Sequence, residues 1–173
     1  MALTAAQVTQ YGATIKANIL ASPDLVGQQD TVIADLYNLA ASPTYWVWRT
    51  TVSRSDLYTK QNDLAIAGAQ TGFWNWTTYK NQGVAEQNAW VQMFMSDVAT
   101  FAAQNIRDGI AAIFTGSAQA TAQVNHCLSI GRRQALRIEK LLATGTGSTA
   151  SPATLGVEGT ISAQNVSDIL AGF

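Results

Sequence analysis

Gly83-Val-Ala-Glu-Gln-Asn-Ala-Trp-Val-Gln-Met-Phe-Met-Ser-Asp-Val-Ala-Thr-Phe-Ala-Ala-Gln104 is the stretch that sets the expected fold class of this chain. Mostly apolar residues recur along it at intervals that match one face of an α-helix. They are Val84, Ala85, Asn88, Val91, Met95, Val98, Ala99 and Ala102. We therefore expect a single helix over residues 83–104 and a mainly α fold.

Two further helices are expected on the C-terminal side of this stretch. The first covers residues 106–114 and is stopped by Gly116, because glycine favours helix ends. The second is opened by Ser117 and is long, reaching about Ala143. Its residues at helical spacing are Val124, Leu128, Arg132, Ala135, Ile138 and Leu142.

Three prolines mark expected boundaries between elements along the chain. Pro23, Pro43 and Pro152 each end an Ala-Ser-Pro tripeptide, and proline disfavours helix in the residue before it. Thr4 is a suitable N-cap for a first helix, and a second helix is expected over residues 28–41. The two helices should form an antiparallel hairpin.

Residues 43–58 fit two patterns. The alternation of Trp46, Trp48 and Val52 is typical of a strand, whereas a longer apolar spacing fits a helix. We favour the helix because nothing nearby in the sequence supplies a pairing strand. Residues 60–72 contain two glycines and little periodicity, which predicts a loop or a short helix.

The C-terminal residues have a different character from the rest of the chain. Thr144-Gly-Thr-Gly-Ser-Thr-Ala-Ser-Pro152 cannot form a core, and it precedes a strand-like Val157-Glu-Gly-Thr-Ile161 and an amphipathic end over residues 162–170. We expect a helical bundle of five or six helices in residues 1–143. Residues 144–173 should be a flexible linker and an extended C-terminal docking arm that contains a short β-strand, with fast amide exchange in the free monomer.

The composition favours association. The chain has 173 residues, 47% of them hydrophobic and only 12% charged, with a net charge of −1. A surface with few charges gives little electrostatic repulsion between protein molecules. This favours a protein that works inside an assembly. No apolar run approaches the length of a membrane span, and the N-terminal residues lack the features of a secretion signal. We therefore expect synthesis in the cytoplasm and no membrane contact.

The sequence offers no convincing active site. The single histidine, His126, is followed by the single cysteine, Cys127, and neighbours on a helix point about 100° apart. A metal site would need three or four ligands, and Gly145-Thr-Gly147 lacks the lysine of a phosphate loop. The carboxylates are scattered singly along the chain. We expect no catalytic residue, no cofactor and no metal, so the protein should not be an enzyme.

Tryptophans occur in two Trp-x-Trp pairs, Trp46 with Trp48 and Trp74 with Trp76. Such residues bury large areas in cores and at subunit contacts. The alternative is a platform for a glycan, for which Trp74-Asn-Trp76-Thr-Thr-Tyr79 has suitable polar flanks. We favour the core or interface interpretation.

A basic run precedes the C-terminal arm. On one continuous helix, Arg133, Arg137 and Lys140 would share a stripe, which could be a solvated face or could meet acidic partner residues or DNA phosphates. Together with apolar residues of the arm, the run forms our predicted partner-binding set. The set is Arg132, Arg133, Arg137, Lys140, Val157, Ile161, Val166, Ile169 and Leu170.

Most of the chain resembles a known family. The likeness rests on Ile33-Ala-Asp-Leu-Tyr-Asn-Leu-Ala-Ala-Ser-Pro43-Thr-Tyr-Trp-Val-Trp48-Arg, on Trp76-Thr-Thr-Tyr-Lys-Asn-Gln82 with Glu86-Gln-Asn-Ala-Trp90, on Ile106-Arg-Asp-Gly-Ile-Ala-Ala-Ile-Phe114, and on Ala143-Thr-Gly-Thr-Gly-Ser-Thr-Ala-Ser-Pro152-Ala-Thr-Leu. These segments resemble small proteins encoded among the head and tail morphogenesis genes of tailed bacteriophages.

The resemblance implies a head-to-tail connector, an adaptor in the neck of the virion. Such an adaptor forms a ring below the portal, expected to have twelve subunits, and DNA passes through its lumen. Its partners would be the portal protein, stopper or tail proteins, and genomic DNA through non-specific contacts. A stopper or tail completion protein of the same neck region is an alternative role.

Overall fold

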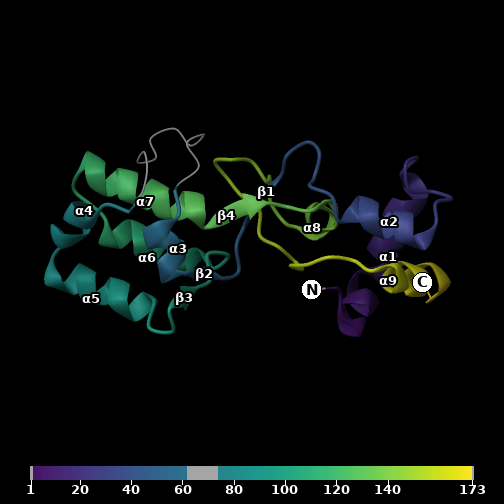
Figure 1. Cartoon of the computed structure of the whole chain (residues 1–173), viewed down its shortest axis with the longest axis horizontal. Helices are drawn as coiled ribbons and strands as arrows, with labels where there is room; N and C mark the ends of the chain where they lie inside the picture. Colours follow the sequence, from purple (N-terminus) through teal and green to yellow (C-terminus); the bar gives the residue numbers. More distant parts are fainter. Residues whose placement is uncertain (1, 62–73, 173) are drawn as a thin grey trace. The chain divides into compact units, whose positions relative to one another are not determined.

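The computed structural model describes residues 2–61 and 74–172, and its fold is mainly α, as the periodicity predicts. Helices account for 53% of the described residues. The described residues form nine helices rather than five or six (Figure 1). The helices are α1 (Ala5–Ala21), α2 (Asp30–Tyr37), α3 (Arg54–Thr59), α4 (Trp76–Lys80), α5 (Val84–Met93), α6 (Gln104–Ile113), α7 (Ala118–Ile130), α8 (Arg137–Leu142) and α9 (Ala163–Gly172).

Four short strands form two small sheets. The strands are β1 (Trp46–Trp48), β2 (Val52–Ser53), β3 (Val98–Ala99) and β4 (Arg132–Gln134). One sheet pairs β1 with β4, and the other pairs β2 with β3. In the second sheet the strands are antiparallel, with Val52 opposite Ala99.

The chain divides into two compact units. Unit 1 consists of Met1–Val47 together with Gln134–Phe173, and unit 2 is Trp48–Arg133. This division differs from the expected boundary after Ala143, because the N-terminal and C-terminal parts of the chain share one core. The chain passes from unit 1 to unit 2 within β1 and returns to unit 1 within β4.

Unit 1 begins with the predicted capped helix. The Thr4 hydroxyl accepts a hydrogen bond from the Gln7 backbone N–H at 3.3 Å, and the Gln7 amide oxygen accepts one from the Thr4 N–H at 2.8 Å. This reciprocal pair satisfies two N–H groups that a helix start leaves open. The core of unit 1 is largely aliphatic and includes Ile15, Ile33 and Ile138.

The C-terminal residues belong to this core and do not extend away from it. Helix α9 lies beside α1 and α2, as Figure 1 shows for the yellow and purple ribbons. Val166 and Ile169 of α9 are fully buried, and Ile161 is 2% exposed. The expected strand over residues 157–161 is reduced to one bridge between Thr160 and Ala2. The partners of this segment lie at the opposite end of the sequence, so no local pattern could reveal them.

The expected flexible linker is also packed in unit 1. The Tyr45 hydroxyl donates to the Gly145 carbonyl at 2.7 Å, and the Trp46 N–H donates to the Gly147 carbonyl at 2.7 Å. Gly147 has a positive φ of 64°, and a Cβ there would lie 2.2 Å from the Tyr45 ring. Ala153 is 1% exposed. The glycines of this segment therefore permit close packing against residues 45–47.

In unit 2, the helix expected over residues 83–104 is interrupted. Helix α5 ends at Met93, and Asp97 adopts a positive φ of 59° in the turn that follows. Val98 and Ala99 then pair with β2. The apolar spacing continues across the break because Ala99 and Phe101 are buried in the same core as Trp90.

The long helix expected to reach Ala143 is divided as well. Helix α7 starts at its predicted cap, with the Ser117 hydroxyl accepting from the Ala120 N–H at 3.1 Å, and it ends before Gly131. A Cβ at Gly131 would lie 1.9 Å from the Phe101 ring. The glycine therefore allows close contact where the chain leaves the helix and enters β4.

The helix favoured for residues 43–58 is wrong over most of its length. The segment forms β1, β2 and the short helix α3, so the alternation of Trp46 and Trp48 was the correct signal. The pairing strands come from β3 and β4, far along the chain. The interpretation of residues 60–72 falls almost entirely outside the described residues.

Candidate interaction sites

The predicted basic stripe is not present, because α7 ends at Ile130 and carries none of its members. Arg132 and Arg133 lie on β4, whereas Arg137 and Lys140 lie on α8. Arg132 is only 6% exposed. The set is therefore divided between unit 2 and unit 1, and only Arg137 and Lys140 share a helix.

Arg137 is held by partners from distant parts of unit 1. Its guanidinium forms a two-pronged ion pair with Asp24, one prong of which measures 3.1 Å. The hydrogen bond from Arg137 holds the pKa of the Asp24 carboxyl below its usual value. The guanidinium carbon also lies 5.6 Å from the centre of the Tyr37 ring, within cation–π range. Burial raises the pKa of Tyr37 to about 12, so its hydroxyl stays protonated.

Lys140 lies one helical turn along α8 from Arg137. Its ammonium donates to the carbonyls of Ser42 and Pro43 at 3.5 and 3.4 Å, both long for hydrogen bonds. It also lies 5.7 Å from the centre of the Tyr45 ring. A cleft of about 180 Å³ opens beside these two cations and is lined by Asn18, Ser42, Arg137, Lys140 and Leu141.

The predicted docking residues of the C-terminal segment are not at the surface. Val157, Ile161, Val166 and Ile169 are at most 5% exposed, and Leu170 is half-buried against the same core. In the folded chain they stabilise unit 1. A docking role for them would first require their release from this core.

An aromatic cluster forms the centre of unit 2. Trp74 is 5% exposed, with its ring centre 4.8 Å from that of Trp90 and 4.9 Å from that of Tyr58. The Trp90 indole donates to the Tyr58 hydroxyl at 3.0 Å. Trp76 is different, because it is 49% exposed. Trp74 therefore fits the core interpretation, and of this Trp-x-Trp pair only Trp76 presents a surface.

A hollow of about 540 Å³ lies between α4 and the start of α7. Every side chain that lines it is neutral, and most carry an amide or a hydroxyl. Several of these groups are already used, since Asn75 caps α4 and Ser117 caps α7. Trp76 is not among the lining residues, so the hollow and the exposed tryptophan do not form one glycan platform. The lining residues are Asn75, Thr77, Thr78, Asn81, Gln82, Thr115, Gly116, Ser117 and Gln119.

His126 and Cys127 are both buried in unit 2. The His126 Nε2–H donates to the Leu57 carbonyl at 2.9 Å, since a carbonyl can only accept. Burial lowers the pKa of His126 and raises the pKa of the Cys127 thiol. A neutral imidazole and a protonated thiol are poor starting points for nucleophilic catalysis. In residues 2–61 and 74–172, no group of three or more His, Cys, Asp or Glu side chains could hold a metal ion.

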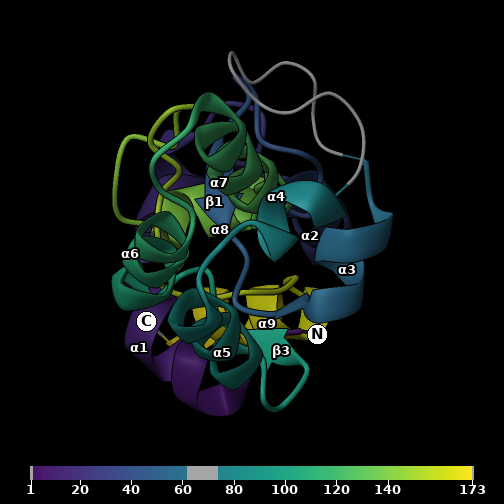
Figure 2. The ribbon, with the colours of Figure 1, turned by 90° about the vertical axis from the view of Figure 1, so that its left-hand side faces the viewer.

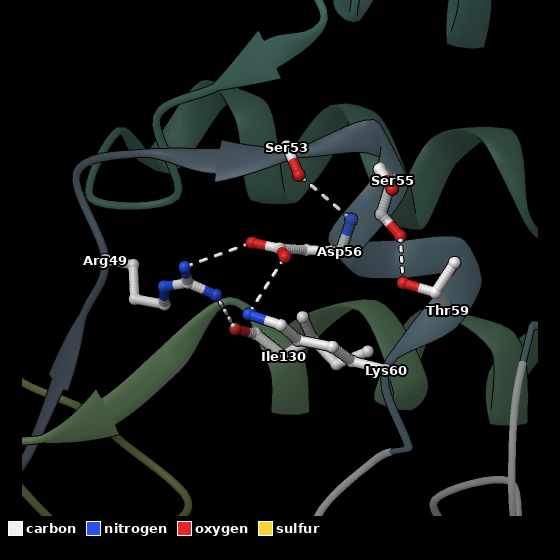
Figure 3. Close-up of polar contacts among 7 residues, drawn as sticks. All are labelled: Arg49, Ser53, Ser55, Asp56, Thr59, Lys60 and Ile130. Carbon is white, nitrogen blue, oxygen red and sulfur yellow. Dashed lines mark hydrogen bonds and ion pairs between the residues drawn. The ribbon is translucent and has the colours of Figure 1, made fainter.

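A polar network ties three elements of unit 2 together (Figure 3). Arg49 donates to the Asp56 carboxylate at 3.1 Å and to the Ile130 carbonyl, at the end of α7, at 3.2 Å. Lys60 completes an ion pair with Asp56 at 2.9 Å. The hydrogen bond from Lys60 is the largest cause that lowers the pKa of Asp56. The network is structural, because it fixes the end of α7 and the start of α3.

The outer face of α5 is apolar and exposed. Val84 is 75% exposed, Val91 48%, and Met95, just beyond the helix, 84%. Beside this face, α5 and α6 border a shallow groove of about 370 Å³, lined largely by small residues such as Ala89, Gly109 and Ala112. Figure 2 shows the ribbons of α5 and α6. The sequence pattern placed Val84, Val91 and Met95 on one helix face, and the structure shows that the core is occupied instead by Trp90, Phe94 and their neighbours.

Comparison of the chain with protein-family models, with curated proteins and with solved structures finds no match. Among the described residues, no helix combines the length and apolar character that a bilayer span requires.

Proposed function

We propose that this chain is a structural virion protein, a head-to-tail connector that forms a ring below the portal and joins the capsid to the tail. The observation that carries the proposal is the apolar outer face of α5, where Val84 and Met95 are 75% and 84% exposed. Several large apolar side chains exposed on one helix are typical of subunit contacts. The family resemblance supplies the identity of the assembly, and DNA would pass through the ring.

The charges of the two units favour a head-to-tail contact between copies. Unit 1 contains three basic and six acidic residues, a net charge of −3, whereas unit 2 contains seven basic and five acidic residues, a net charge of +2. A contact between unit 1 of one copy and unit 2 of the next would pair opposite charges. Contacts of this heterologous kind generate closed rings when the rotation between copies closes.

The decisive measurement is the mass of the purified protein, alone and with portal protein, by light scattering. A ring alone, or a ring that forms only with portal, supports the connector role. A monomer in both samples contradicts it. A ring-size complex that binds tail proteins but not portal would indicate a stopper or tail completion protein instead.

Two variants test the surface itself. The double change Val84→Glu and Val91→Glu adds charge to the α5 face and should abolish ring formation. The control is the double change Ala118→Glu and Thr121→Glu, which adds the same charge at two exposed positions of α7. Both proteins should keep the circular dichroism and urea midpoint of the unchanged chain. Rings of normal size from the α5 variant would show that this face is not the contact.

The C-terminal segment can be tested separately. Packed as described, residues 157–170 should be protected from amide exchange in the free protein, unlike the expected flexible arm. If the segment docks onto a neighbouring subunit, assembly should change this protection as the segment leaves its own core. Equal protection before and after assembly would show that rigid surfaces, and not an arm, form the ring.

A further inference from the structure

The cleft beside α8 presents hydrogen-bond donors almost exclusively. The Asn18 amide oxygen already accepts from the Tyr37 hydroxyl at 2.8 Å, so its NH₂ group is the part of that side chain left for a ligand. Arg137 and Lys140 have no acceptor atoms. The cleft lining contains no carboxylate. This lining favours a group that accepts hydrogen bonds and carries negative charge.

Neither cation of the cleft is saturated. The ion pair with Asp24 uses two of the five N–H donors of Arg137. The hydrogen bonds of Lys140 are the long ones of 3.5 and 3.4 Å to backbone carbonyls, and its other contact is with the face of the Tyr45 ring. A carboxylate would give it a shorter hydrogen bond between two opposite charges.

Asp24 shows that Arg137 already binds one carboxylate. Its side chain is 54% exposed, and it is not part of the cleft lining. A second carboxylate could thus reach Lys140 and the Asn18 amide, and the free donors of Arg137 could contribute.

The size and surroundings of the cleft favour a protein carboxylate over a nucleic acid. Its volume of about 180 Å³ suits one small group. DNA-binding surfaces instead place many cations along the phosphate backbone. Unit 1 has a net charge of −3, which would repel a polyanion more than a single carboxylate.

We propose that this cleft binds an Asp or Glu side chain of a partner protein, through Lys140, Arg137 and the Asn18 amide. The carboxylate chemistry follows from the cleft alone. That the partner is a portal or tail protein rests on the proposed function.

The probe is an acetylated, amidated hexapeptide with one glutamate and five serines, titrated into the full chain at low salt by calorimetry. Lys140→Gln should weaken binding at least about tenfold, the loss expected for one hydrogen bond to a charged group. Lys16→Gln is the control, because Lys16 lies in the same unit outside the cleft and donates to the Leu170 carbonyl at 3.1 Å. It should bind like the unchanged chain.

Asp24→Asn should change peptide binding in the opposite direction from Lys140→Gln. It removes the internal carboxylate that competes for Arg137, so peptide binding should become tighter. A residue that only supported the fold would weaken binding when replaced. Unchanged or weaker binding by a folded Asp24→Asn chain would overturn the proposed role of Arg137.

Two further arms complete the test. The side-chain amide signals of Asn18 should shift in NMR spectra when acetate is added to the unchanged chain, a readout that needs no variant to fold. A duplex oligonucleotide of twelve base pairs should not bind in a Lys140-dependent way. Lys140-dependent binding of the oligonucleotide without binding of the peptide would overturn the proposal in favour of DNA. These binding experiments use the free chain, so their outcome is independent of ring formation with portal. Either the binding proposal or the connector proposal can fail while the other holds.

Discussion

The two units of this chain are stabilised by different kinds of core. Unit 2 is one continuous segment, and it buries a cluster of aromatic rings around Trp74 and Trp90. Unit 1 joins the two ends of the chain around Ile and Val side chains, with Tyr37 as a fully buried aromatic residue. A continuous unit is formed by contacts between nearby segments. A discontinuous unit exists only once residues more than a hundred positions apart have met.

This contrast explains why the C-terminal residues were mistaken for an arm. Residues 144–173 have no core of their own, and their partners in α1 and α2 lie at the far end of the sequence. Taken alone, the segment has the composition of a tether. Packed against α1 and α2, it contributes Val166 and Ile169 to the centre of unit 1.

The largest expected effect tests that assignment. Ile169→Lys places a charge at a fully buried position of α9, and burying an unpaired charge costs several kcal/mol. Unit 1 should lose its fold, seen as loss of amide protection in α1, α2 and α9. Unit 2, which has a separate core, should keep its protection.

The matched control for this change is Gln164→Lys, at an exposed position of the same helix. It adds the same charge and should alter the free energy of unfolding by less than about 0.5 kcal/mol. Similar behaviour of the two variants would mean that α9 is not part of the core.

The features that depend on nearby residues could be predicted from the sequence, whereas those that depend on distant contacts could not. The caps Thr4 and Ser117 were predicted because a cap depends on residues three positions away. The breaks at residues 94–97 and at Gly131 were missed, because they follow from β2–β3 pairing and from the Phe101 ring. In each case the cause is a contact made by the folded chain.

The candidate sites also depend on contacts between residues that are distant in the sequence. Arg137 and Lys140 could be selected by charge alone, but Asp24 is 113 residues from Arg137 and could not be paired with it from spacing. The exposed face of α5 was missed for a different reason. Helix α5 has apolar residues on both faces, and periodicity could not tell which face Trp90 would bury.

The second prediction concerns the aromatic core of unit 2. Trp90→Ala removes a fully buried ring and leaves the Tyr58 hydroxyl without its indole partner. We expect a loss of about 3–5 kcal/mol in the free energy of unfolding, measured by urea titration. Trp76→Ala, at a 49% exposed ring, should cost about 1 kcal/mol. Equal losses would show that the cluster is not divided into buried and exposed rings.

The third prediction concerns the polar network of Figure 3. Arg49→Met keeps a long apolar side chain but removes the bonds to Asp56 and to the Ile130 carbonyl. It should cost about 2 kcal/mol, because hydrogen bonds to charged groups contribute about 1.5–3 kcal/mol when partly buried. Arg54→Met is the comparison, since its partner Asp97 is 74% exposed, and it should cost less than about 1 kcal/mol. A reversed order would exclude the network as a stabiliser of α7.

The smallest expected effect is a pH dependence of stability that is confined to unit 2, because the single histidine lies in that unit. Burial lowers the pKa of His126 below its usual 6.5, so the unfolded chain binds the proton more readily than the folded one. The stability of unit 2 should therefore be fully present above pH 6.5 and fall as the pH drops below it, by at most about 1.4 kcal/mol per pH unit.

The carboxylates Asp24 and Asp56, whose pKa values are lowered, titrate at more acidic pH. Amide exchange at pH 7.5 and pH 5.5, corrected for the intrinsic rates, should show the loss in α7 but not in α1. A His126→Gln chain should lose the pH dependence whatever its absolute stability, and a loss of equal size in both units would mean that they unfold as one.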